Sequence, residues 1–154
     1  MEIITEKPVA IASDHAGYAL KEAVKKHLEE AGVAYADLGT NSTESVDYPV
    51  FAAALCKTIQ SDNVDLGILI CGTGVGMSMA ANKHKGIRAA CVSDTFSAKA
   101  TRMHNNANVI CFGERVVGQG LAFELVDAFL TTPYEGGRHE RRVKLLEDIE
   151  NSQK

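Results

Sequence analysis

The chain has 154 residues, a length typical of a single domain with a substantial core. Its net charge of −4 at pH 7 gives no overall basic character, which argues against a nucleic-acid partner. Its apolar runs are too short to cross a bilayer, and its first residues lack the basic segment and apolar stretch of a signal peptide. We therefore expect one domain over residues 1–154, with neither a nucleic-acid nor a membrane partner.

Short apolar runs alternate with longer amphipathic segments along the chain. The expected strands are Val9–Ser13, Val33–Asp37, Leu66–Cys71, Arg88–Ser93 and Val109–Phe112. The expected helices are Ala16–Ala31, Tyr48–Ser61, Val75–Lys83, Asp94–Asn105, Gly118–Leu130 and Arg138–Asn151. This alternation predicts an α/β, three-layer αβα Rossmann-like fold around a five-stranded parallel sheet. The strands lack polar alternation, as expected when helices cover both faces of the sheet.

A breaker segment, Thr131–Gly137, precedes the last expected helix. It contains a proline and two glycines, which are typical of loops. We expect an αβ body over about residues 8–131 and an additional C-terminal helix over about residues 138–151. Its separation from the body favours packing elsewhere, for example on a second subunit.

The four cysteines are Cys56, Cys71, Cys91 and Cys111. None lies two or three residues from another, so the sequence shows neither a zinc-type nor a redox pair. Cys91 and Cys111 lie inside apolar runs and are predicted to be small buried side chains. This cysteine usage favours a reducing, cytoplasmic compartment.

The most informative segment begins at the end of the third expected strand, at Cys71. Three glycines then alternate with two other residues, in the order Gly72, Thr73, Gly74, Val75 and Gly76. Uncovered backbone N–H groups at a helix N-terminus favour an anion. A tight turn without a ligand is the simpler alternative. A dinucleotide site is a weak alternative because the spacing is not G-x-G-x-x-G, although Asp94 lies at a suitable distance.

Cys71 has two interpretations. It can be the last packed residue of a buried strand, or a nucleophile or base activated by the helix N-terminus. A base beside N–H donors suits proton abstraction next to a carbonyl, because the enediolate that forms needs donors at its oxygens. The hydroxyl of Thr73 could move protons between those oxygens.

The histidines fall into two groups. His15 follows Asp14 at a strand end, and His104 lies at the end of a helix, where functional residues often collect. Each can also be an ordinary surface histidine. His27 and His84 lie among lysines on helical segments and are predicted to be solvated.

Arg138 and Arg142 are four residues apart and therefore share one helical face. Two guanidinium groups there could bind a phosphate, or they could simply begin a solvated basic helix. Cations at a helix N-terminus oppose the helix dipole, which favours a functional reason for them. Arg115, after the fifth strand, is a further candidate cation.

Together these pieces resemble the type B ribose-5-phosphate isomerases, a family that includes the galactose-6-phosphate isomerase subunits. The matching stretches are S-D-H-A-G (Ser13–Gly17), D-Y-P (Asp47–Pro49), I-L-I-C-G-T-G-V-G-M-S-M-A-A-N-K (Ile68–Lys83), G-I-R-A (Gly86–Ala89), H-N-N-A-N-V (His104–Val109), F-G-E-R-V-V-G (Phe112–Gly118) and Y-E-G-G-R-H-E-R-R-V (Tyr134–Val143). They run in order over nearly the whole chain.

The resemblance implies an aldose–ketose isomerase without metal or cofactor, which interconverts D-ribose 5-phosphate and D-ribulose 5-phosphate through a cis-enediolate. The catalytic residues that it implies are Cys71 as the base, Thr73 as the adjacent hydroxyl, and His104 with Asp14 in opening the furanose ring. The substrate-binding residues that it implies are His15, Arg138 and Arg142 on the phosphate, Gly72, Gly74, Val75 and Gly76 in the enediolate cradle, and Tyr48, Asn105 and Arg115 in further contacts. It also implies a homodimer or homotetramer with active sites shared between subunits.

Three alternatives stay open at the level of sequence. The substrate can be a six-carbon sugar phosphate, allose 6-phosphate or galactose 6-phosphate, which needs more room near Thr40–Val46. The chain can also be a module that binds a phosphosugar or nucleotide without chemistry, although such a module has no need of Cys71 or His104. A dinucleotide oxidoreductase is the third alternative.

Overall fold

The computed structural model describes residues 1–153 and contains one five-stranded parallel sheet. Its strands are β1 (Val9–Ser13), β2 (Tyr35–Asp37), β3 (Gly67–Cys71), β4 (Ala89–Cys91) and β5 (Val109–Gly113). They lie in the order β2-β1-β3-β5-β4, so β1, β3 and β5 are central and β2 and β4 are the edges. The predicted parallel sheet is confirmed.

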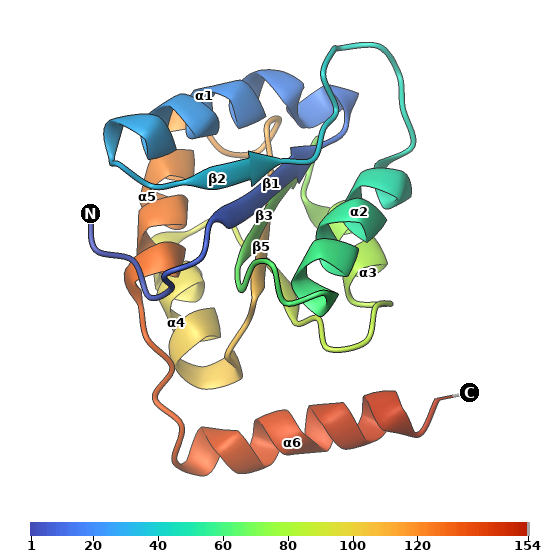
Figure 1. The fold of residues 1–154 in the computed structure, drawn as a ribbon, viewed down its shortest axis with the longest axis vertical. Coiled ribbons are helices and arrows are strands. Elements are labelled where there is room, and N and C mark those ends of the chain that lie inside the picture. Colours follow the sequence, from blue (N-terminus) through green and yellow to red (C-terminus); the bar gives the residue numbers. More distant parts are fainter. Residues whose placement is uncertain (154) are drawn as a thin grey trace.

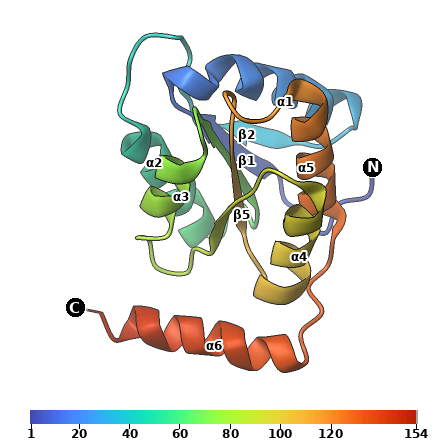
Figure 2. The same ribbon diagram turned by 180° about the vertical axis from the view of Figure 1, so that it is seen from behind.

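Helices cover both faces of the sheet (Figures 1 and 2). They are α1 (Tyr18–Glu30), α2 (Tyr48–Gln60), α3 (Val75–Ala81), α4 (Thr95–Asn105), α5 (Gln119–Thr131) and α6 (Arg138–Asn151), and a short 3₁₀ turn, His15–Gly17, precedes α1. α1, α4 and α5 pack on one face, while α2 and α3 pack on the other. Among residues 1–153, no helix is both long enough and apolar enough to cross a bilayer.

The central strands β1, β3 and β5 are buried at every position because helices cover both of their sides. In β3, Ile68 and Ile70 face the layer of α1, α4 and α5, while Leu69 and Cys71 face α2 and α3. Alternation along the strand therefore places Cys71 in the α2–α3 layer, at the end of the sheet where the loops to those helices begin.

The edge strands correct one prediction. Cys111 on β5 is fully buried, as expected, but Cys91 on β4 is exposed. The reason is that β4 has a neighbour on one side only, and its pairing with β5 ends at Cys91 itself. All four cysteines are unpaired thiols.

A second correction concerns His27, which was predicted to be solvated. Its ring stacks on Phe123 at 4.3 Å between centroids, and its Nε2 lies 2.7 Å from Asp127 Oδ1. His27 therefore joins α1 to α5. His84 lies half-buried just beyond α3, with Nδ1 2.9 Å from the carbonyl oxygen of Ala80.

Helix α6 runs across one end of the body and connects to it at two places (Figure 1). Near its start, the N–H of Glu135 donates to the carbonyl of Met103 on α4 at 3.1 Å. Near its end, the carboxylate of Glu150 accepts from the N–H of Gly86 at 3.0 Å. Between these contacts α6 leaves the apolar side chains Leu145, Leu146 and Ile149 exposed.

Candidate active site

The loop between β3 and α3 is nearly free of side chains for steric reasons. Gly74, the residue before α3, has a φ of 84°, and a Cβ there would lie 2.8 Å from the Cα of Phe112 on β5. A Cβ on Gly113 would collide with the backbone of Gly72 and Thr73. The loop backbone therefore lies directly against the end of β5. At its helix end, the N–H of Val75 donates to Thr73 Oγ1 at 3.3 Å.

Cys71 lies at the start of this loop and is 5% exposed. The N–H of Gly74 donates to its sulfur at 3.1 Å, an interaction that stabilises negative charge on Sγ. The other buried thiols differ. Burial raises the pKa of Cys56 to about 11 and raises the pKa of Cys111 well above its ordinary value. These two thiols stay protonated near neutral pH, so they are packed side chains without reactivity.

Two predicted site residues follow β1, at the same end of the strands as Cys71. The N–H of Asp14 donates to the carbonyl of Ile70 at 3.2 Å, so Asp14 lies beside the end of β3. Its buried carboxylate accepts from the N–H of Gly17 at 3.1 Å and caps the 3₁₀ turn. His15 Nδ1 accepts from the N–H of Val46 at 3.1 Å, so a neutral His15 carries its proton on Nε2.

Two more predicted residues contact the glycine loop itself. Tyr48 begins α2, and a Cβ on Gly76 would lie 2.8 Å from its ring. Arg115 donates its N–H to the carbonyl of Gly72 at 3.0 Å, and its Nη1 would lie 3.3 Å from a Cβ on Gly72. A phenol and a guanidinium therefore flank the loop. The structure brings together, at the C-terminal ends of the strands beside Cys71, the predicted residues Asp14, His15, Tyr48, Thr73 and Arg115.

The remaining predicted residues lie at the opposite end of the strands, where β5 begins. His104 and Asn105 end α4, immediately before β5 begins, whereas Cys71 pairs with the last residue of β5. A five-residue strand is about 16 Å long, and this length separates the two groups. Arg138 and Arg142 start α6 beside the end of α4. One chain therefore does not bring Cys71 together with His104.

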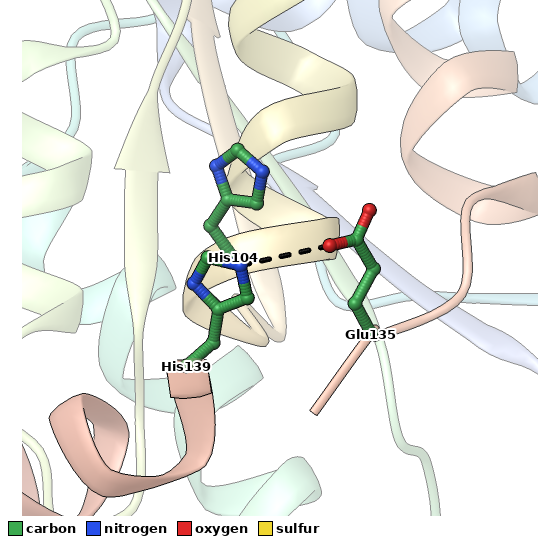
Figure 3. A group of neighbouring side chains, drawn as sticks. All are labelled: His104, Glu135 and His139. Carbon is green, nitrogen blue, oxygen red and sulfur yellow. Dashed lines mark ion pairs between the residues drawn. The ribbon is translucent and has the colours of Figure 1, made fainter. Parts of the chain in front are cut away.

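His104 lies in a small cluster of its own (Figure 3). Its ring stacks on that of His139, with 4.5 Å between centroids and 17° between planes. Glu135 Oε2 lies 3.5 Å from His139 Nε2. Burial, followed by the neighbouring His104 and Arg138, lowers the pKa of His139. The cluster thus holds a neutral, buried imidazole against the ring of His104.

Comparison with known proteins identifies this architecture. The family model described as Ribose/Galactose Isomerase matches residues 9–146. The chain belongs to that family.

Relatives of the family match over nearly their whole length. Ribose-5-phosphate isomerase B of Escherichia coli is 50% identical over 144 residues, which are 94% of this chain and 97% of that protein. The structure of Clostridium thermocellum ribose-5-phosphate isomerase B has a TM-score of 0.92 at 45% identity and covers 94% of this chain and 97% of that one. The structure of the Mycoplasma genitalium enzyme with bound ribulose 5-phosphate has a TM-score of 0.91 at 42% identity, covering 97% and 99%. The predicted α/β fold is confirmed.

Sequence reasoning missed several groups in this member of the ribose/galactose isomerase family. Glu114 donates its N–H to the carbonyl of Cys71 at 2.9 Å, and its carboxylate accepts from the N–H of Leu20 on α1. In the same motif, the sequence predicted a role for the neighbouring Arg115 alone. Glu135 and His139 were also given no role. Their only signal was a spacing of four residues across a helix start, and the importance of that spacing depends on how α6 packs.

Proposed function

We propose that this chain interconverts D-ribose 5-phosphate and D-ribulose 5-phosphate, with Cys71 as the base. The observation that carries the proposal is the thiol of Cys71 held at the start of a glycine-rich loop, with the N–H of Gly74 directed at its sulfur. Membership of the ribose/galactose isomerase family supports it, as do the names of the E. coli and M. genitalium relatives. The same support weighs against a binding module or a dinucleotide enzyme.

The proposed reaction moves one proton from C2 to C1 and one from O2 to O1, with no net change of oxidation state. The Cys71 thiolate takes the proton from C2 of the open-chain aldose, and the electron pair forms the C1–C2 double bond of a cis-enediolate. Backbone N–H groups from Gly72 to Gly76 stabilise the two oxygens of this intermediate. The thiol then returns the proton to C1, while the hydroxyl of Thr73 moves a proton between O1 and O2. The ketose that results is an isomer of the substrate.

The substrate-binding roles follow from charge. Arg138 and Arg142 share one face of α6 and bind the phosphate dianion together with His15, which offers an Nε2–H donor when neutral. His104, with Asp14, assists opening of the furanose ring. Tyr48, Asn105 and Arg115 make further contacts to the sugar.

These roles need a second copy of the chain, because Cys71 lies at the C-terminal ends of the strands and His104 lies at their N-terminal ends. We place His104, Asn105, Arg138 and Arg142 of one copy over the Cys71 loop of another, in a homodimer or a pair of dimers. The exposed apolar side chains Leu145, Leu146 and Ile149 on α6 offer a surface for this association.

The first test is turnover of ribose 5-phosphate by the purified chain with chelator present and no cofactor. Cys71→Ala should abolish ketose formation, because the base is lost, and leave substrate binding nearly intact. Cys91→Ser is the matched control: this second thiol donates to the carbonyl of Thr73 at 3.7 Å but is outside the proposed chemistry. A Cys71→Ala protein with the kcat of the wild type would end the proposal. Faster turnover of allose 6-phosphate would keep the chemistry and change the substrate to a hexose phosphate.

A further inference from the structure

Three potential metal ligands meet where α6 packs against α4. They are His104, Glu135 and His139, and their nearest nitrogen and oxygen atoms all lie within 4.8 Å of one another (Figure 3). No role in binding a metal follows from the isomerase chemistry, which needs none. We propose that these three side chains bind one divalent transition-metal ion of the zinc type, and that the ion inhibits the isomerase.

The donor set and its spacing fit such an ion. Two imidazole nitrogens and one carboxylate oxygen are ligands that zinc accepts, usually with water in the fourth position of a tetrahedron. Bonds of about 2.0–2.1 Å place tetrahedral ligand atoms about 3.3 Å apart. The Nε2 of His139 and Oε2 of Glu135 are already 3.5 Å apart. The ring of His104 now stacks almost parallel to that of His139, so binding requires it to rotate until its lone pair points to the same ion.

Backbone contacts hold the segment that carries Glu135 and His139 independently of any ion. Residue 135 is held on α4 by its N–H bond to the carbonyl of Met103 at 3.1 Å. Gly136 and Gly137, with φ of 65° and 58°, turn the chain so that His139 faces Glu135 across the start of α6. His139 is 7% exposed, so its ring has little freedom to leave the cluster. The ligands are therefore largely positioned before an ion arrives, which lowers the entropic cost of binding.

The charges around the cluster set the expected strength of binding. The carboxylate of Glu135 favours a cation, while Arg138 and Arg142 oppose it. We therefore expect binding weaker than that of structural zinc sites.

The inhibitory half of this inference rests on the proposed function. An ion on His104 takes the lone pair that would serve in ring opening, and it lies beside the arginines assigned to the phosphate. The metal site itself stands on geometry alone. The two halves can therefore fail separately.

The test of the site uses the full chain carrying Cys71→Ala and Cys91→Ser, which removes thiols as competing ligands. Equilibrium dialysis with Zn²⁺, and the visible absorption of Co²⁺ as a probe of coordination, should show one ion per chain. Glu135→Gln and His139→Gln should each weaken binding by more than about tenfold, a loss seen even for groups that only support metal ligands. His84→Gln, outside the cluster, should bind as before. Because Glu135 is exposed, its variant keeps the test valid if His139→Gln does not fold.

Absence of a bound ion, or equal binding after Glu135→Gln and His139→Gln, would overturn the site. The inhibition arm uses the chain with its cysteines intact. Zn²⁺ should inhibit turnover, chelator should reverse it, and Glu135→Gln should raise the half-inhibitory Zn²⁺ concentration by the same factor as it weakens binding. Stoichiometric binding at the cluster without inhibition would support the metal site and overturn the role of His104 in turnover.

Discussion

Cys71 and His104 lie at opposite ends of the strands of one chain, and this separation leads to a specific prediction about mixed oligomers. Cys71→Ala and His104→Gln should each be inactive or nearly so as homodimers. In a two-fold symmetric dimer whose sites each take Cys71 from one copy and His104 from the other, a mixed dimer has two unequal sites. One site carries both substitutions, while the other carries neither. Two inactive proteins should therefore produce an active one.

The size of the recovery follows from counting sites. Random pairing of equal amounts makes about half of the dimers mixed, and each mixed dimer has one of its two sites intact. The mixture should therefore reach about a quarter of the wild-type kcat per chain. An isolated mixed dimer should reach about half, with the KM of the wild type, because its intact site is complete.

The assay needs mixed dimers of known composition. Co-expression of the two variants with different affinity tags, followed by two purification steps, yields mixed dimers whose turnover of ribose 5-phosphate is then measured. A mixed dimer of Cys71→Ala with Cys71→Ser is the control, because both of its sites lack the thiol and no recovery is possible. If verified mixed dimers of Cys71→Ala and His104→Gln stay inactive, the shared site is refuted.

Three further predictions concern single substitutions. Gly74→Ala should destabilise the fold by about 1–3 kcal/mol and lower Tm, because φ is 84° and a Cβ would meet the β5 backbone; an unchanged melting curve would contradict this. Burial raises the pKa of Asp37, but its 2.6 Å hydrogen bond from the buried Lys21 helps to hold that pKa below the ordinary value of 3.8. This stabilisation is complete well above pH 3.8 and is lost as the pH falls through the lower folded-state pKa, so Asp37→Asn should flatten the acid limb of denaturant-unfolding free energies measured from pH 2 to 7. Arg142→Ala should chiefly raise KM for ribose 5-phosphate. Arg141→Ala should not raise KM, because the side chain of Arg141 points about 100° away from that of Arg142 on the helix. Equal effects of the two substitutions on KM would argue against the phosphate role of Arg142.

The bounds of some elements were predictable from sequence because each is a continuous run of one kind, either a buried strand or an amphipathic helix. Val9–Ser13 and Arg138–Asn151 have the predicted bounds, the first as a fully buried run and the second as a helix preceded by two glycines. The edge strands were predicted too long. The segment Arg88–Ser93 is apolar enough for a strand, but the strand comprises only Ala89–Cys91 because it has a single partner.

The candidate site was predictable as a collection of residues but not as a geometry. The glycine alternation and its neighbour Cys71 are local in sequence, so the loop could be read directly. The separation of His104 from Cys71 depends on which end of α4 faces which end of the sheet. The contact of Glu135 and His139 with His104 depends on the packing of α6, and the pairing of His27 with Asp127 joins residues 100 positions apart. Such contacts leave no periodic signal in one chain.

The close contact between the Gly72–Thr73 backbone and Gly113 has a consequence for how the substrate enters. With no side chain between them, neither loop can move without displacing the other, and the loop after β5 is in turn tied to α1 through Glu114. The Gly72–Gly76 loop is thus expected to be preformed for the enediolate before the sugar binds, and not to close over it as a lid. In the dimer proposed above, admission and release of the sugar would then depend on the exposed Asn41–Ser45 segment and on the α6 end of the second copy. In such an enzyme the contact between subunits would control access to the site, while the fold of each chain would only hold the cradle in place.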